Sequence, residues 1–183
     1  MKALEGKKRC VAFWQPAHGK SHAPDQDFTM DDWVDWLISG MDELNIKKAV
    51  ICGHSMGGML TMNAVLKYPE RFKAMILVGT QDSAWDEEKN EGFLMAVDMV
   101  SVGWGTELAP QVADLLMGES FLKREPSWIG TWTNEVSEYD LTGMSKLGPA
   151  ICGRKDVSDK IGEIGIPALV VHGTLDKGIE INY

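Results

Sequence analysis

The sequence has 183 residues, of which 44% are hydrophobic and 25% are charged. This composition is typical of one folded domain with a substantial core, and it argues against intrinsic disorder. The net charge of −9 and the pI of about 4.9 exclude the basic surface that nucleic-acid-binding proteins need.

The sequence also indicates in which cellular compartment the protein is expected. Its apolar runs are too short to cross a bilayer, and the lysine-rich stretch after Met1 lacks the apolar core of a signal peptide. The three cysteines, Cys10, Cys52 and Cys152, are widely spaced, which favours free thiols over disulfides or a metal site. We therefore expect a cytoplasmic protein.

Two elements are predicted in the first quarter of the chain. Residues 9–14 read as a buried strand, which Pro16 ends. A helix is expected to begin after Thr29, whose side chain can cap it, and to end at Asn45. Its apolar face is formed by residues at helical spacing: Met30, Trp33, Val34, Leu37, Ile38, Met41 and Leu44.

Strands and helices then alternate along the chain. We predict strands over residues 48–53, 72–79 and 168–172, and a helix over residues 56–68 that Pro69 ends. The first of these strands is apolar on both faces, as in a covered parallel sheet. The alternation predicts an α/β fold with a mainly parallel sheet and flanking helices.

Residues 81–163 break this alternation. They contain helical stretches over residues 93–100 and 109–117, together with several large apolar side chains: Trp85, Met95, Met99, Trp104, Met117, Trp128, Trp132 and Met144. We predict a helical cap inserted into a core formed by residues 1–80 and 164–183. The apolar side chains indicate an apolar, small to medium substrate, although core packing explains any single one equally well.

Residues 53–57, Gly-His-Ser-Met-Gly, fit the pattern G-x-S-x-G. The pattern is weak by itself, but here a strand precedes it and a helix follows it, which is the setting of a nucleophile elbow. The turn is so tight that Gly53 and Gly57 are expected to be free of side chains, and Gly58 to allow close packing of the helix. This setting predicts that Ser55 is a nucleophile and not a serine in an ordinary turn.

The residues beside Ser55 would have distinct roles. The backbone N–H of Met56, at the start of the helix, is expected to be one donor of an oxyanion hole. His54 lies inside the elbow, directly before Ser55.

Residues 53–58, Gly-His-Ser-Met-Gly-Gly, resemble the elbow of α/β-hydrolases of the esterase, lactonase and cofactor-free haloperoxidase kind. Residues 16–21 resemble the turn after the fourth strand of that family, and residues 29–32 the start of its next helix. Residues 167–176 resemble the seventh strand and the loop after it, and residues 154–157 match enol-lactonase-like members. The resemblance covers nearly the whole chain and implies a partial α/β-hydrolase fold.

The resemblance assigns Asp176 as the acid of a Ser-His-Asp triad, with Asp82 as a rival because some relatives place the acid there. The triad acid orients a histidine and stabilises its imidazolium form. The resemblance implies no metal and no organic cofactor. A zinc site at His18 and His22 is not favoured either, because Gly19 lies between them in an expected loop.

The sequence departs from the family in three ways. The family order is Ser, Asp, His, yet the seven residues after Asp176 (183 − 176 = 7) include no histidine. His18, His54 and His172 match positions that are structural in the family, and His22 lies in a loop.

The second departure is at the start of the chain. No counterpart of the family's first three strands, or of the second oxyanion donor, precedes Arg9. Trp14 also stands where relatives usually carry an aspartate. In the family sheet a strand would lie between residues 9–14 and 48–53, so we expect unpaired backbone groups on both sides of that gap.

The leading hypothesis is a hydrolase of carboxylic esters or lactones that is truncated at both ends in this sequence. The 183-residue chain alone is then expected to be inactive or nearly so, because losing the base costs about 10⁶ in turnover. One alternative is a non-catalytic binding protein with the same fold. Another is a fragment that another chain completes. The expected partner is a small-molecule substrate, with no nucleic acid and no membrane, and the oligomeric state stays open.

Overall fold

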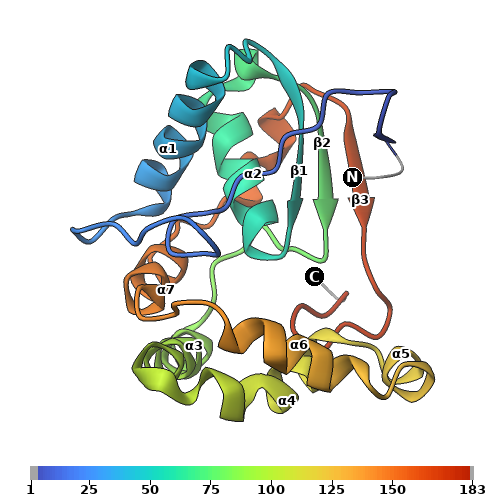
Figure 1. Ribbon diagram of the computed structural model, residues 1–183. Coiled ribbons are helices and arrows are strands. Elements are labelled where there is room, and N and C mark those ends of the chain that lie inside the picture. Colours follow the sequence, from blue (N-terminus) through green and yellow to red (C-terminus); the bar gives the residue numbers. More distant parts are fainter. Residues whose placement is uncertain (1–3, 182–183) are drawn as a thin grey trace.

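The structure is a computed structural model that describes residues 4–181. Three parallel strands form one sheet in the order β1 (Ala49–His54), β2 (Phe72–Val78) and β3 (Ala168–Val171). Helices α1 (Met30–Glu43) and α2 (Met56–Lys67) lie beside this sheet (Figure 1). The parallel sheet and its flanking helices confirm the predicted α/β class.

The remaining helices follow β2. In Figure 1 the arrowheads of the strands point toward α3 to α6, so these helices lie beyond the carboxyl ends of the sheet. The bounds are α3 (Glu87–Met99), a π-helical turn (Val100–Trp104), α4 (Gly105–Leu116), α5 (Glu119–Arg124), α6 (Trp128–Ser137) and α7 (Met144–Cys152), with 3₁₀ turns at Pro69–Arg71 and Ser158–Glu163. We propose residues 81–163 as a cap, although α7 also buries Leu147 and Ile151 in the main core.

Helix α1 begins as the sequence predicted. The N–H of Asp32 donates to the Thr29 hydroxyl at 3.2 Å, and the N–H of Thr29 donates to the Asp32 carboxylate at 2.8 Å. This reciprocal cap satisfies two backbone donors, and the hydrogen bonds from Thr29 lower the pKa of Asp32. The helix ends at Glu43, with Leu44 as its C-cap, two residues before the predicted end; Asn45 just beyond adopts a φ of 54°.

The main core lies between α1, α2 and the sheet. Trp33 and Val34 of α1 are fully buried, as is Phe72 at the start of β2. Helix α2 is buried along most of its length because it packs between α1 and the strands. This packing fixes the start of α2, and with it the turn that joins β1 to α2.

The predicted strand over residues 9–14 is wrong. The segment forms no strand, has no ladder partner among the described residues, and contacts α1 and the residue that caps its end. The Arg9 guanidinium donates to the carbonyl of Leu44 at 3.2 Å, and the ring of Phe13 meets Trp36 edge-on at 5.9 Å. The segment has strand-like composition, but a strand also needs a neighbour to supply backbone hydrogen bonds, and none lies beside it.

Both edges of the sheet are open. Within residues 4–181, β1 pairs only with β2, and all four residues of β3 are exposed. Val50 of β1 is 55% exposed, and Val170 of β3 is 66% exposed. The open edge of β1 is consistent with the gap expected from the sequence. In the same described range, no helix combines the length and the apolar character that a membrane crossing requires.

Two leucines on neighbouring strands give a direct test of this burial pattern. Leu77 of β2 is 6% exposed and Leu169 of β3 is 56% exposed. Leu77→Ala should lower the free energy of unfolding by about 2–5 kcal/mol, because it leaves a cavity in the core. Leu169→Ala should change it by less than about 0.5 kcal/mol. Urea unfolding followed by tryptophan fluorescence measures both, and equal losses would contradict the described sheet.

Candidate active site

Ser55 occupies a strained turn between β1 and α2. Its φ of 52° and ψ of −120° are rare for a residue with a side chain. The N–H of Ser55 donates to the carbonyl of Val78 at 2.9 Å, which ties the turn to the end of β2. Such strain persists only where surrounding contacts enforce it, and it is concentrated at functional sites.

The glycines of this turn differ in what they permit. A Cβ atom on Gly53 would lie 2.0 Å from the carbonyl oxygen of Gly57, and one on Gly58 would lie 2.5 Å from the side chain of Thr80. A Cβ on Gly57 would meet nothing within 4 Å. The steric requirement predicted for Gly53 and Gly58 is therefore present. The steric requirement predicted for Gly57 is wrong. Only its backbone carbonyl approaches Gly53, and a side chain on Gly57 would point into open space.

The start of α2 points backbone donors at the turn. The N–H groups of Gly58 and Met59 donate to the carbonyl of Ser55, at 2.8 and 3.3 Å. The N–H of Met56 makes no hydrogen bond within residues 4–181. A free N–H at the positive end of a helix can donate a hydrogen bond to a developing oxyanion, which is the role expected for Met56.

Asp176 lies on the loop that follows β3, and its carboxylate is held by backbone donors. The N–H groups of Gly178 and Ile179 donate to Oδ1 at 3.0 and 2.9 Å. The second oxygen, Oδ2, lies 3.6 Å from Nε2 of His172. Two fixed donors on one oxygen hold the carboxylate in place and leave the other oxygen able to accept a further hydrogen bond.

The structure brings Ser55 and Asp176 to the same end of β2. Ser55 bonds to Val78, as described above. A Cβ atom on Gly79 would lie 3.2 Å from Oδ2 of Asp176 and 3.6 Å from Nε2 of His54. The predicted nucleophile and the predicted acid therefore flank one short stretch of backbone at the carboxyl edge of the sheet, where ligands bind in such folds.

The rival acid Asp82 occupies a different setting. It lies in the loop after β2, and its backbone carbonyl accepts a hydrogen bond from the N–H of Val157 at 3.2 Å. Its carboxylate has no hydrogen bond to any residue in the described range 4–181. Asp176 is therefore the better oriented of the two carboxylates.

In two of the four histidines, a ring nitrogen is hydrogen-bonded to a backbone carbonyl. Nε2 of His172 lies 2.7 Å from the carbonyl oxygen of Ile179, and Nδ1 of His18 lies 2.9 Å from that of Pro16. A carbonyl oxygen only accepts, so each of these nitrogens carries the proton. His22 is exposed in a loop, and His54 is exposed next to the turn.

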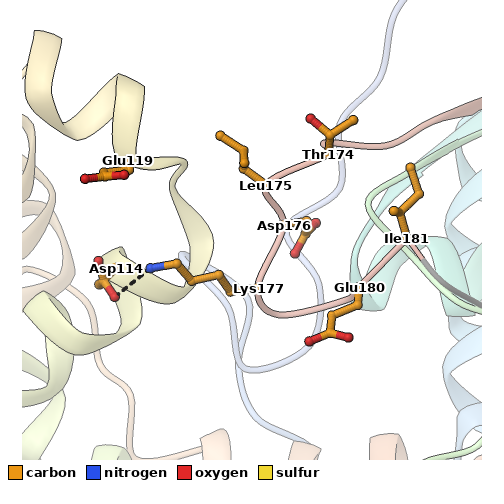
Figure 2. A pocket seen from close by; sticks show the side chains of 8 residues that line it. All are labelled: Asp114, Glu119, Thr174, Leu175, Asp176, Lys177, Glu180 and Ile181. Carbon is orange, nitrogen blue, oxygen red and sulfur yellow. Dashed lines mark hydrogen bonds and ion pairs between the residues drawn. The ribbon is translucent and has the colours of Figure 1, made fainter.

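A hollow of about 640 Å³ lies between the Asp176 loop and helices α4 and α5 (Figure 2). Asp176 lines it, but none of its described lining residues belongs to the Ser55 turn. Lys177 donates across its lower side to Asp114 at 3.0 Å, and Glu119 and Glu180 also face it. The hollow is thus an open space beside the acid loop and not a closed pocket around Ser55.

The sequence did not point to Thr80, which contacts the turn directly. Its hydroxyl donates to the carbonyl of Ser55 at 2.7 Å, and its side chain fills the space above Gly58. A threonine two residues after the strand that ends at Val78 was the available signal. Threonine is common in loops, so this signal is weak without coordinates.

A strained serine between a parallel strand and a helix, with a carboxylate from a later loop at the same sheet edge, defines the α/β-hydrolase class. The sequence profile of the family described as alpha/beta hydrolase fold matches residues 1–183. The chain therefore belongs to the alpha/beta hydrolase family.

Several proteins of known name are similar to this chain. It is 24% identical to 3-oxoadipate enol-lactonase 2 of Acinetobacter baylyi, over 94% of this chain and 63% of that protein. It is 27% identical to the dihydrolipoyllysine-residue acetyltransferase component of the acetoin cleaving system of Pseudomonas putida, over 99% and 48%. The chain spans less than two thirds of the length of either relative.

Solved structures show the same fold. The thermophilic esterase from Thermogutta terrifontis superposes with a TM-score of 0.83 at 23% identity, over 91% of this chain and 61% of that one. The enol-lactonase from Burkholderia xenovorans LB400 superposes with a TM-score of 0.76 at 24% identity, over 87% and 60%.

The two glycines of the turn give a matched test of its geometry. Gly53→Ala should lower the free energy of unfolding by at least about 3 kcal/mol, because its Cβ would overlap the backbone of Gly57. Gly57→Ala adds the same atom in open space within α2, and should raise stability by up to about 1 kcal/mol. Thermal unfolding compares the two variants, and a harmless alanine at position 53 would refute the described approach of the two backbones.

Proposed function

We propose that this chain is the central part of a serine hydrolase that acts on carboxylic esters or lactones. Ser55 is the nucleophile, Asp176 is the acid, and the N–H of Met56 is one oxyanion donor. The observation that carries the proposal is the strained conformation of Ser55 between β1 and α2. An ordinary turn has no need for this strain, whereas a nucleophile elbow uses it to present the hydroxyl.

The proposed reaction follows the serine hydrolase scheme. The Ser55 oxygen attacks the carbonyl carbon of the substrate, and its proton passes to a histidine base. The N–H of Met56 stabilises the negative charge on the carbonyl oxygen. The histidine then protonates the leaving alcohol, and water attacks the acyl group, returns the proton to Ser55 and releases the acid. Asp176 holds the histidine in the correct tautomer throughout.

The histidine base is proposed to come from outside these 183 residues. His172 and His18 each donate a ring proton to a backbone carbonyl, and no histidine follows Asp176 in the sequence. Oδ2 of Asp176 can accept a hydrogen bond from an added imidazole. We therefore propose that the chain by itself hydrolyses esters weakly or not at all.

The substrate class is proposed from the relatives and the cap together. Two of the similar proteins are named as enol-lactonases and one as an esterase. In the helices beyond the sheet, Trp128 stacks on Trp132 with ring centroids 5.6 Å apart, and Phe121 meets Trp128 edge-on at 5.5 Å. These rings are only half-buried, which supports an apolar acyl or alcohol group near them.

Completion by another chain is a second candidate, and the open sheet edges favour it. The outer edge of β1 and all of β3 lack cover within residues 4–181, as described above. Hydrolysis that appears only after a histidine-containing partner is added, and that disappears with the partner's histidine, would support this arrangement over a single longer chain.

Labelling by a fluorophosphonate tests the nucleophile. The Ser55 oxygen should displace fluoride and form a bond to phosphorus, slowly because no base assists it. Mass spectrometry of tryptic peptides should find the adduct on Ser55. Ser55→Ala should abolish it, whereas Ser127→Ala, at an exposed position before α6, should leave it unchanged. An adduct spread over several serines, or none at all, would remove the basis of the proposal.

Added imidazole separates the two candidate acids. Imidazole should accelerate labelling of Ser55, because it supplies the base that Asp176 can orient. Asp176→Asn should reduce this acceleration by roughly tenfold, the worth of one charge-assisted hydrogen bond. Asp82→Asn should have no effect. The reverse ranking would make Asp82 the acid, and Ser55→Ala corrects for any reaction between imidazole and the probe.

A further inference from the structure

Arg154 is a buried cation whose role the proposed reaction does not explain. It follows α7 and is 5% exposed. Its Nη1 donates to the carbonyl of Ile151 and its Nη2 to the carbonyl of Ser83, each at 2.8 Å. No carboxylate oxygen lies within 4.0 Å of its guanidinium among the described residues, and burial lowers its pKa. The carboxylate of Asp156 acts on this charge only from a longer distance, so the guanidinium is buried without a direct ion pair, which is costly.

The surroundings of Arg154 are not optimised for stability alone. Its guanidinium lies over the ring of Trp85, with the central carbon 4.6 Å from the ring centroid. In the same cluster Nε of Arg154, Nε1 of Trp85 and Oε1 of Gln81 are buried without a hydrogen-bond partner in the described range. Apolar side chains often replace such groups without loss of stability. The three unsatisfied polar atoms therefore offset part of what the hydrogen bonds and the cation–π contact contribute to stability.

Arg154 and its neighbours hydrogen-bond to the loop between β2 and α3, residues 79–86. Arg154 bonds to the carbonyl of Ser83, as given above. The carboxylate of Asp156 accepts the N–H of Ala84 at 2.9 Å, and the N–H of Val157 donates to the carbonyl of Asp82 at 3.2 Å. Three consecutive loop residues, 82–84, are thus hydrogen-bonded to residues 154–157, which lie more than seventy positions later in the chain.

The other end of this loop touches the nucleophile. Thr80 donates to the carbonyl of Ser55 at 2.7 Å and packs against Gly58, as described above. Between Thr80 and Ser83, the side chain of Gln81 donates back to the carbonyl of Ser83 at 3.1 Å and so stiffens the loop. A contact chain therefore leads from Arg154 through the loop to the backbone of Ser55.

We propose that Arg154 is a positioning residue that fixes Thr80, and through Thr80 the carbonyl and hydroxyl of Ser55. This inference rests on the proposed function, because it assigns Arg154 to the reactivity of the same serine. Arg154 itself touches neither the serine nor a substrate. Its guanidinium spans two carbonyls at once, which an ammonium group cannot do in the same geometry.

The test measures the rate of Ser55 labelling by a fluorophosphonate alongside the free energy of unfolding in urea, on the full chain. Arg154→Met should slow labelling by about tenfold, since small misplacements of a reacting group cost that much or more, while the chain stays folded under the labelling conditions. Thr80→Val should slow labelling similarly, and the double variant no further, because both act on one path. Lys155→Met, at the exposed neighbouring position, is the matched control and should change neither quantity.

Several outcomes would overturn the inference. One is a labelling rate of folded Arg154→Met that equals the rate of the natural chain. Another is a labelling rate that falls only in proportion to the folded fraction. The third is a double variant whose slowing equals the product of the two single effects. If Arg154→Met does not fold, Arg154→Lys decides: a folded lysine variant that labels as fast as the natural chain rejects the role. Absence of labelling in the natural chain would instead reject the proposed function.

Discussion

The site depends on one close approach between two stretches of backbone. Gly53 and the carbonyl of Gly57 lie so near each other that no side chain fits between them, and this contact forces Ser55 into its left-handed conformation. Everything that gives the serine its proposed chemistry follows from that bend. Ser55 lies directly between β1 and α2, α2 begins with Met56, and the N–H of Met56 has no hydrogen-bond partner among residues 4–181.

The end of β2 is where the remaining parts of the site meet. Val78 accepts the N–H of Ser55, Gly79 lies beside Asp176, and Thr80 donates to the carbonyl of Ser55. The strand that carries these residues is the middle one of the sheet, so it is held on both sides. A central strand is a rigid place on which to assemble groups from distant parts of a chain.

Much of this arrangement could be predicted from the sequence because the signals are local. The capping residue Thr29 and the apolar periodicity gave α1, and the pattern around Ser55 in its strand–helix setting gave the turn. The strand predicted over residues 9–14 is absent. Composition reports only a preference for extended backbone, whereas a strand also requires a neighbouring strand to share its hydrogen bonds. The hydrogen bond from Arg154 to the carbonyl of Ser83 spans 71 positions, and no local sequence pattern predicts such a contact.

The exposed outer strand of the sheet also affects how copies of this chain behave in concentrated solution. Its apolar side chains, and the backbone groups on its outer edge that pair with no strand among residues 4–181, offer a nearby extended chain a place to bind. The net charge of −9 keeps like molecules apart at low ionic strength, but dissolved salt screens that repulsion over distances beyond about 10 Å. The chain should consequently stay dispersed longest in dilute buffer, and a purification that relies on high salt would work against it.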